Sequence, residues 1–197
     1  MKFDSDIDID VGDRSVFLSH LKHIPASMTR DGAVCKHNSG IHITEIPVDS
    51  VKGCASLDFE TAQDRGYIKL DVLNVSLYQQ ITSETHLQRL MEREPPWHRL
   101  YDPAFCGKLI HIGRHYNSLI SMPEAVNSIP RLAMFLAIIR PAKKHLIGYT
   151  WKEVAKTIWD KPEDGSYGFK MSHSLGYSHL VAVHMNLLDE ADSILAV

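Results

Sequence analysis

Cysteine is scarce in this chain, and its few cysteines form no recognisable motif. There are 3 among 197 residues, Cys35, Cys54 and Cys106, far apart and with no Cys-x-x-Cys pair. Structural zinc sites and disulfide frameworks need closely spaced or evenly numbered cysteines, so this pattern argues against both. We expect ordinary buried thiols in a reducing compartment, which favours a cytoplasmic location.

Long hydrophobic runs and a strong net charge are missing as well. The longest apolar run, residues 132–139, is too short to span a bilayer, and the acidic start of the chain is unlike a signal peptide. With 21 Lys and Arg against 24 Asp and Glu, the formal net charge is −3. No global positive field attracts nucleic acid, so such a contact needs a local basic patch. We expect no membrane contact.

The rest of the composition is that of an ordinary globular protein, with 44% hydrophobic and 23% charged residues. Alternating apolar residues predict strands over residues 5–11, 41–48 and 66–73. Helical spacing predicts a helix over residues 14–24, and the polar residues 26–39 suggest a loop.

The pattern changes at Ser83, after which the chain is helical throughout. The predicted fold class is therefore α+β, with an α+β core over residues 1–82 and a helical region over 83–197. Apolar spacing predicts helices in the second region over residues 83–94, 123–141, 150–159 and 175–197. The stretch 123–141 is predicted to be divided into two helical parts at Pro130.

The stretch FDSDIDIDVG, residues 3–12, places an aspartate at every second position. On a strand, residues two apart share a face, so Asp8 and Asp10 point the same way, about 7 Å apart. Two like charges at this spacing repel unless a cation lies between them, and carboxylate pairs are common ligands of Mg²⁺. Asp71 ends the third predicted strand, so three carboxylates converge if the first and third strands are neighbours.

A charged edge strand is the competing interpretation of the same aspartates. Charge on an edge discourages pairing with other chains. For the Asp-x-Asp motif alone this is the preferred interpretation, and it suits Asp4 and Asp6. The aspartate at position 71 shifts the balance towards a metal site.

Cationic side chains suited to a phosphate-rich ligand occur later in the chain, notably in KLIHIGRH (108–115) and RPAKKH (140–145). A solvated helix end explains the second stretch equally well, because cations favour helix C-termini. A zinc site at His111 and His115 lacks a third ligand at metal spacing. The candidates are Lys69, His111, Arg114, His115, Arg140, Lys143, Lys144, Lys170, His173 and His179.

Five segments, in order, are similar to the catalytic core of the bacterial C-family replicative DNA polymerase, the alpha subunit of DNA polymerase III. They cover most of the chain. The segments are SDIDIDV (5–11) at the family's Asp-x-Asp strand, HNSGIHITEIPV (37–48) at its Gly-x-His-x-x-Gly stretch, GYIKLDVLNVSLYQQI (66–81) at its third metal aspartate, LAMFLAIIRP (132–141) at its Arg-Pro stretch, and YGFKMSHSLGYSHLVAVHMNLL (167–188) at its Lys-Ser-His segment.

The resemblance implies a nucleotidyltransferase-like (polymerase-beta-like) palm sheet over residues 1–82 and a reduced, fingers-like helical region over 83–197 that completes the site. It implies a Mg²⁺- or Mn²⁺-dependent transferase with two metal ions, acting on DNA or a nucleotide. Catalytic metal ligands would be Asp8, Asp10 and Asp71, and the phosphate or substrate would be bound by Lys69, His42, Arg140, Lys170, Ser172 and His173.

The chain also departs from the family pattern. The family's Gly-Ser loop, which helps to hold the incoming triphosphate, is absent before the Asp-x-Asp strand, Met171 replaces the lysine before Ser-His, and Ala142 replaces a glycine. The missing Gly-Ser loop favours a substrate other than a free deoxynucleotide. A reduced relative of this kind is expected in a bacteriophage genome.

Two transfer reactions remain open, each with pyrophosphate as the leaving group. One is nucleotidyl transfer, and the other places a group on a DNA base activated as a pyrophosphate ester, as in phage DNA hypermodification. The alternatives are a non-catalytic remnant that binds DNA or a polymerase, and a structural protein with an acidic edge strand. For Ser172 a helix N-cap role is the competing interpretation, and the three tryptophans are expected to pack helices rather than stack on bases.

Overall fold

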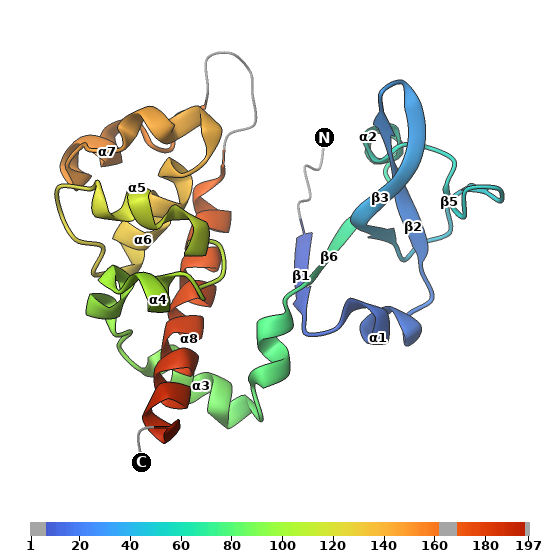
Figure 1. Ribbon diagram of the computed structural model, residues 1–197. Coiled ribbons are helices and arrows are strands. Elements are labelled where there is room, and N and C mark those ends of the chain that lie inside the picture. The colour runs from blue at the N-terminus through green and yellow to red at the C-terminus, as the bar shows by residue number, and fades with distance from the viewer. Residues whose placement is uncertain (1–6, 162–168, 196–197) are drawn as a thin grey trace. The chain divides into compact units, whose positions relative to one another are not determined.

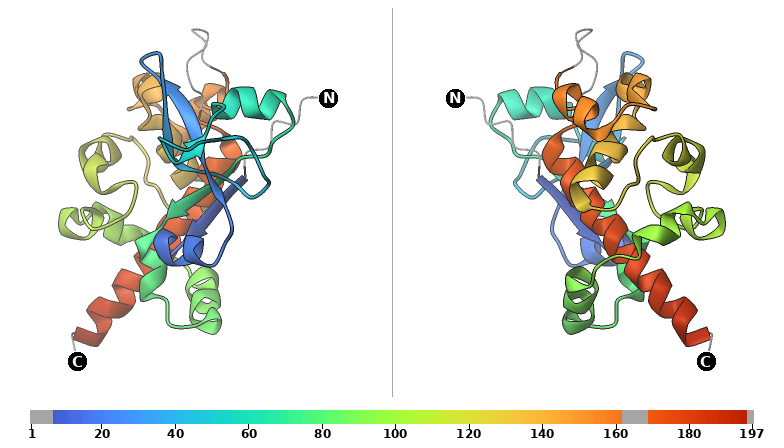
Figure 2. Two further views of the ribbon diagram at one scale, coloured as in Figure 1. Left: turned by 90° about the vertical axis from the view of Figure 1, so that its right-hand side faces the viewer. Right: turned by 90° about the vertical axis from the view of Figure 1, so that its left-hand side faces the viewer.

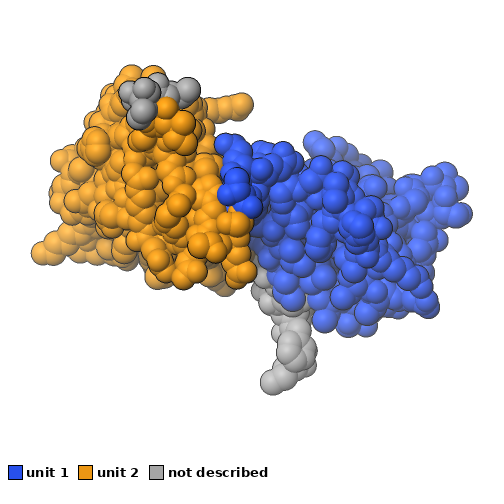
Figure 3. Space-filling view, turned by 90° about the horizontal axis from the view of Figure 1, so that it is seen from below, with its two compact units in different colours: residues 1–82 blue, residues 83–197 orange. Residues whose placement is uncertain are grey.

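The computed structural model describes residues 7–161 and 169–195 and divides the chain into two compact units, residues 1–82 and 83–197 (Figure 3). The strands belong to unit 1, and unit 2 is built from helices (Figure 1). The α+β class predicted from the sequence is confirmed. Across the described residues, no helix has both the length and the apolarity needed to cross a membrane.

Unit 1 is organised around a mixed four-stranded sheet in the order β1-β6-β3-β2. Its strands are β1 (Ile7–Val11), β6 (Leu70–Asn74), β3 (Ala33–His42) and β2 (Ile24–Arg30). β1 runs parallel to β6, whereas β6 with β3 and β3 with β2 are antiparallel. The first and third predicted strands are therefore neighbours, and β1 is an edge of the sheet.

The prediction of a loop over residues 26–39 is wrong, because β2 and β3 form a hairpin there. Its turn residues Asp31 and Gly32 have φ of 52° and 76°, the two positive values that a two-residue type I′ turn requires. Asp-Gly is a strong hairpin signal. The sequence pattern nevertheless predicts a loop, because the exposed ends of both strands carry the polar residues that are typical of loops.

The predicted helix over residues 14–24 is too long. Helix α1 spans only Arg14–Ser19, and Ile24 already begins β2. Asp13 caps α1, its carboxylate accepting from the backbone N–H of Ser15 and Val16. Pro25 lies inside β2, where it is tolerated because β2 is an edge strand whose register shifts between Pro25 and Ser27.

The remaining elements of unit 1 are short. The predicted strand over residues 41–48 is divided, since β3 ends at His42 and the next strand starts at Val48. The buried Ala55 and Ala62 form a small second core with Ile46. The short elements are β4 (Val48–Asp49), β5 (Cys54–Ala55), α2 (Phe59–Asp64) and the 3₁₀ helix η1 (Ser76–Gln80).

Unit 2 is assembled on one long helix, α8 (Met171–Leu195), which runs the length of the unit (Figure 2). Helices α3 and α6 pack against it, and the core includes the fully buried Phe135 of α6 and Met185 of α8. The other elements are α3 (Glu84–Glu92), η2 (Trp97–Tyr101), α4 (Pro103–Cys106), η3 (Gly113–His115), α5 (Tyr116–Ile120), α6 (Ile129–Ile138), η4 (Pro141–Leu146) and α7 (Trp151–Thr157).

Within the predicted helical stretch 123–141 the structure has one α-helix, α6, which begins at Ile129. Residues 123–128 are not helical, and the predicted helix break at Pro130 is wrong. Pro130 lies in the first turn of α6, where its missing N–H costs no hydrogen bond. The preceding Ser128 caps the helix. Trp151 is a buried packing residue, as expected, and its indole N–H donates to the carbonyls of Glu124 and Ala125.

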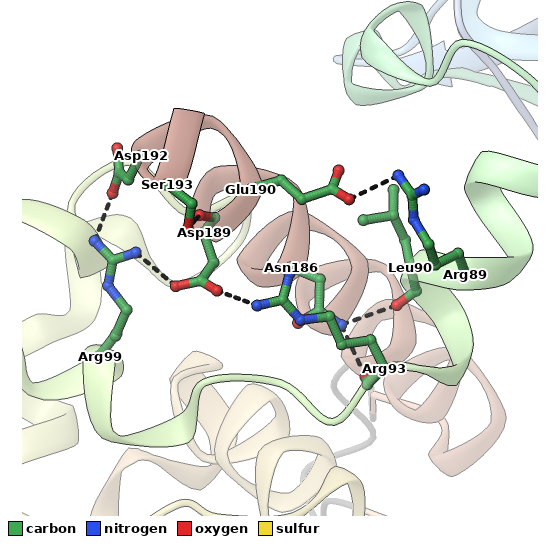
Figure 4. A network of polar contacts seen from close by, with 9 residues as sticks. All are labelled: Arg89, Leu90, Arg93, Arg99, Asn186, Asp189, Glu190, Asp192 and Ser193. Carbon is green, nitrogen blue, oxygen red and sulfur yellow. Dashed lines mark hydrogen bonds and ion pairs between the residues drawn. The ribbon is translucent and has the colours of Figure 1, made fainter. Parts of the chain in front are cut away.

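A polar network joins the C-terminal half of α8 to α3 and η2 (Figure 4). Arg99 donates to Asp189 at 2.9 Å and also pairs with Asp192, and its guanidinium lies 4.1 Å from the ring centre of Phe105. Asn186 is buried and donates to two carbonyls at the end of α3. The network also contains the pairs Arg89–Glu190, Arg93–Asp189 and His86–Glu190.

Candidate active site

The pairing of β1 with β6 places the three predicted metal ligands on one face of the sheet. Asp8 is the direct register partner of Asp71, and Asp10 is the partner of Leu73. Partners in a ladder point to the same face, and so do residues two apart on a strand. Asp8, Asp10 and Asp71 therefore share a face, whereas Asp4 and Asp6 lie outside the described residues.

The two aspartates of β1 repel each other. Burial and then the charge of Asp8 raise the pKa of Asp10 above its ordinary value. The charge of Asp10 in turn adds to burial in raising the pKa of the Tyr78 hydroxyl. Asp8 and Asp10 are both solvent-exposed. This end of the face thus carries concentrated negative charge that a cation would relieve.

Asp71 is neutralised within unit 1. One carboxylate oxygen pairs with the ammonium of Lys69, and the other accepts from the Ser39 hydroxyl at 2.7 Å. The side chains of Asp71 and Lys69 are only 13% and 16% exposed. Lys69 directly precedes β6 and is two residues from Asp71, so the alternation of the extended chain places both side chains on one face.

A bulge in β3 brings Ser39 to Asp71. The pairing of β3 with β2 moves from Ser27–Lys36 to Pro25–Ile41, so residues 37–40 have no counterparts in that ladder. The extra residues bend the strand and re-aim its side chains. On the other side Gly40 pairs with Asp71 of β6, which places the bulge beside the carboxylate.

His37 stabilises the bulge from within. Its Nδ1 accepts from the backbone N–H of Gly40 at 2.8 Å and of Ser39 at 3.3 Å. Nδ1 lies 3.7 Å from the Asp71 carboxylate, but a nitrogen that accepts two N–H groups has no proton to donate there. Burial, followed by the charge of Lys69, lowers the pKa of His37. The ring is therefore neutral at pH 7, with its proton on Nε2. It stabilises the conformation of the bulge and adds no positive charge to the site.

Gly40 is required by close packing in this bulge. A Cβ built there would lie 3.0 Å from each of three atoms, the Cβ of Ala26, the Nδ1 of His37 and the Cδ of Lys69. We expect Gly40→Ala to lower the free energy of unfolding by about 1–3 kcal/mol through overpacking. Hydrogen exchange of the β3 and β6 amides measures this in unit 1.

Gly176→Ala is the matched control for Gly40→Ala. Gly176 lies inside α8, and an added Cβ would meet no atom within 4 Å. Alanine is the better helix former, so this variant should be more stable by up to about 1 kcal/mol. If Gly40→Ala left the hydrogen exchange of the β3 amides at the wild-type rate, the packing account of the bulge would be wrong.

Two further residues, not anticipated from the sequence, frame the site. Arg14 of α1 donates to the carbonyl of Val72 at 3.1 Å and to that of Ser39 at 3.3 Å, and so ties α1 to β6 and the bulge. The Phe59 ring centre lies 5.2 Å from the Lys69 ammonium. Phe59 thus contacts Lys69 directly, and Arg14 supports the backbone of two residues beside or bonded to Asp71.

His42, predicted to bind substrate, is 0% exposed and lies in the interior of unit 1. Its Nδ1 donates to the carbonyl of Ile68 at 2.9 Å, whereas the buried Nε2 has no partner among the described residues. Burial is the main cause of its lowered pKa. This placement favours a role in holding β3 to the segment before β6.

The other four predicted substrate-binding residues belong to unit 2. Arg140 precedes η4 and is half-buried, with its guanidinium 4.6 Å from the ring centre of Phe169. Lys170 directly precedes α8, and Ser172 and His173 lie in the first turn of this helix. The interpretation of Ser172 as the N-cap is wrong, because the helix already begins at Met171.

The aspartates supply the hard oxygen ligands that Mg²⁺ prefers, and the repulsion between Asp8 and Asp10 favours a cation beside them. Asp71 could join them only by exchanging Lys69 for the metal. Within residues 7–161 and 169–195, no three His, Cys, Asp or Glu side chains are clustered as a metal site. The chemistry of the donors thus fits Mg²⁺, and the three-aspartate metal site stays a prediction.

Comparisons with protein-family models, with curated proteins and with solved structures give no match. The site is therefore interpreted from its own geometry and from the sequence.

Histidines give the protein a predictable response to acid. Burial is the first cause of the lowered pKa of five of them. Below about pH 6.5 these histidines therefore bind protons more readily in the unfolded chain than in the folded chain. Stability is therefore complete above that pH and falls with further acidification. Denaturant unfolding at pH 7.5 and 5.5 should show the lower stability at pH 5.5, and an increase would contradict this account. The five are His37, His42, His111, His115 and His184.

Proposed function

We propose that the protein is a Mg²⁺-dependent transferase that acts on DNA, with pyrophosphate as the leaving group. The observation that carries the proposal is the direct pairing of Asp8 with Asp71, which puts Asp8, Asp10 and Asp71 on one sheet face beside Lys69. Paired carboxylates with an adjacent cation suit a substrate that is rich in phosphate charge. The ordered similarity of five segments to the DNA polymerase III alpha core supports a nucleotidyltransferase-like palm.

The residues of unit 1 have separate roles in this proposal. When bound, Mg²⁺ ions would stabilise the attacking and leaving oxygens in nucleotidyl transfer, and the departing pyrophosphate when a group replaces it on a base carbon. Asp8, Asp10 and Asp71 would hold them. Lys69, once released from Asp71, would be available to neutralise phosphate charge. His37 keeps its proton on Nε2 and maintains the bulge, so it is a positioning residue.

Two substrates fit this chemistry, and one assay separates them. We would measure pyrophosphate release with Mg²⁺ from a deoxynucleotide plus primed DNA, and from DNA that carries a pyrophosphate-activated thymine base plus an amine nucleophile. Release in the first reaction supports nucleotidyl transfer, and release in the second supports base modification. Absence of release from both, with Mg²⁺ or Mn²⁺, would reject the transferase.

A non-catalytic DNA- or polymerase-binding protein is the second candidate. It is favoured by the position of β1 at the sheet edge, where charge also prevents strand pairing, and by the neutralisation of Asp71 by Lys69. This candidate predicts that Asp10→Asn keeps full biological activity. The transferase predicts that the same variant loses it.

A further inference from the structure

Arg140 is an unusual arginine in unit 2. The described arginines Arg89, Arg93, Arg99 and Arg131 each form an ion pair with a carboxylate. The side chain of Arg140 has no ion pair or hydrogen bond with the described residues, and its Nε is buried. Its guanidinium is held over Phe169 by a cation–π contact. A half-buried charge without a counter-ion has a desolvation cost in free energy. An anion from outside the chain would offset this cost.

His111 is a second unusual residue, in the loop between α4 and η3. Its φ is 64°, in the left-handed region that residues other than glycine seldom adopt. The ring Nε2 is buried and has no partner among the described residues. The ring centre lies 4.6 Å from that of Tyr177, which itself stacks on Phe169 at 5.9 Å. Backbone strain and unpartnered buried polar atoms are typical of functional positions.

The stacked rings of Phe169 and Tyr177 link Arg140 to His111. Three more basic residues belong to the adjoining 3₁₀ helices, Arg114 and His115 to η3 and Lys144 to η4. The charge of Arg140 contributes, after burial, to the lowered pKa of His111. For His115 the causes are burial and then Lys144, Arg140 and Arg114. None of these five side chains forms an ion pair with a carboxylate of the described residues. Arg140 directly follows the C-cap of α6, where a cation is favoured. Solvation at this helix end does not explain its side chain, because Nε is buried.

We infer that Arg140, His111 and His115, with Arg114 and Lys144 around them, form a binding site for a phosphate group in unit 2. A dianionic phosphate can accept from a guanidinium, two imidazoles and an ammonium together, and it would satisfy the buried nitrogens of Arg140 and His111. The phosphate could come from a nucleotide or from a DNA backbone. The site goes beyond the proposed transferase, because it depends on contacts within unit 2 alone.

The test is a titration of the full chain with inorganic phosphate at constant ionic strength, followed by calorimetry and by NMR of the histidine ring protons. We expect saturable binding and an increase in the pKa of His111 and His115, because a dianion favours their charged forms. Sulfate-free buffer without phosphate gives the reference. Absence of binding at tens of millimolar phosphate, or unshifted histidines, would overturn the site.

Variants show whether binding belongs to these residues. Arg140→Gln is expected to weaken phosphate binding by about 10–100-fold, through the loss of charge-assisted hydrogen bonds. Lys144→Gln, whose side chain is exposed, provides a second variant should Arg140→Gln unfold, and a smaller loss is expected. Lys152→Gln, an exposed lysine of α7, is the matched control. Wild-type affinity in both Arg140→Gln and Lys144→Gln would contradict the inference.

Competition then identifies the source of the phosphate. Displacement of inorganic phosphate by thymidine monophosphate supports a nucleotide ligand, and displacement only by a short single-stranded oligonucleotide supports a DNA backbone. Failure of both to compete would overturn the assignment to a nucleic-acid phosphate.

Discussion

Asp10→Asn is expected to lower the rate of transfer on DNA by about 10²–10⁴-fold, since a metal ion in such a site supplies several kcal/mol of transition-state stabilisation. The amide is close in shape to the carboxylate but lacks its charge. The fold should be retained, because Asp10 is exposed and its raised pKa shows that its charge is disfavoured in the folded chain. We expect the metal-free variant to be as stable as the wild type, or more stable by up to about 0.5 kcal/mol.

Asp31→Asn is the matched control for this substitution. Asp31 lies exposed in the hairpin turn of β2 and β3 with a positive φ, which asparagine adopts readily. It makes the same change of charge in unit 1, away from the three aspartates, and should leave the rate unchanged. Full activity in Asp10→Asn would contradict the catalytic role, and an equal loss in both variants would point to a general effect of charge.

Asn186→Ala is expected to lower the free energy of unfolding of unit 2 by about 2–4 kcal/mol. The Asn186 amide donates to the carbonyl of Leu90 at 2.9 Å and to that of Arg93 at 2.8 Å. Asn186 is 0% exposed. Its removal leaves two carbonyls at the end of α3 without donors, and each such loss costs about 1–3 kcal/mol.

Tryptophan fluorescence during denaturant unfolding measures this effect in unit 2 alone, because Trp97, Trp151 and Trp159 all belong to that unit. Asn117→Ala is the control, since Asn117 is exposed on α5, and it should change stability by no more than about 0.5 kcal/mol. A loss below about 1 kcal/mol for Asn186→Ala would mean that water or the neighbouring arginines satisfy the two carbonyls.

Local patterns were sufficient for the parts of the fold that bury a regular face. The alternation in residues 5–11 and 66–73 predicts two strands, which the structure has over residues 7–11 and 70–74, and their pairing gives the shared face of the aspartates. The same reasoning failed for β2 and β3, whose exposed ends carry polar side chains and whose turn signal is only two residues long. It also placed a helix break at Pro130, because proline in a first turn and proline in a helix interior look alike in sequence.

Much of the candidate site depends on contacts that the sequence does not contain. His37 and Ser39 reach Asp71 only because β3 bulges between its two neighbours, and register is a property of the paired strands. The polar run before Gly40 was the available signal, since glycine within a strand often marks a bulge or a close approach. The cation–π contacts of Lys69 with Phe59 and of Arg140 with Phe169 are non-local in the same way.

The most direct test of the metal site is a crystal soaked with Mn²⁺, with anomalous density measured beside Asp8, Asp10 and Asp71. The account predicts density next to Asp8 and Asp10, and an Asp71 carboxylate that has exchanged the Lys69 ammonium for metal. Lys69 still paired with Asp71, and no density at millimolar Mn²⁺ with DNA bound, would contradict the transferase and leave the acidic strand as a charged edge.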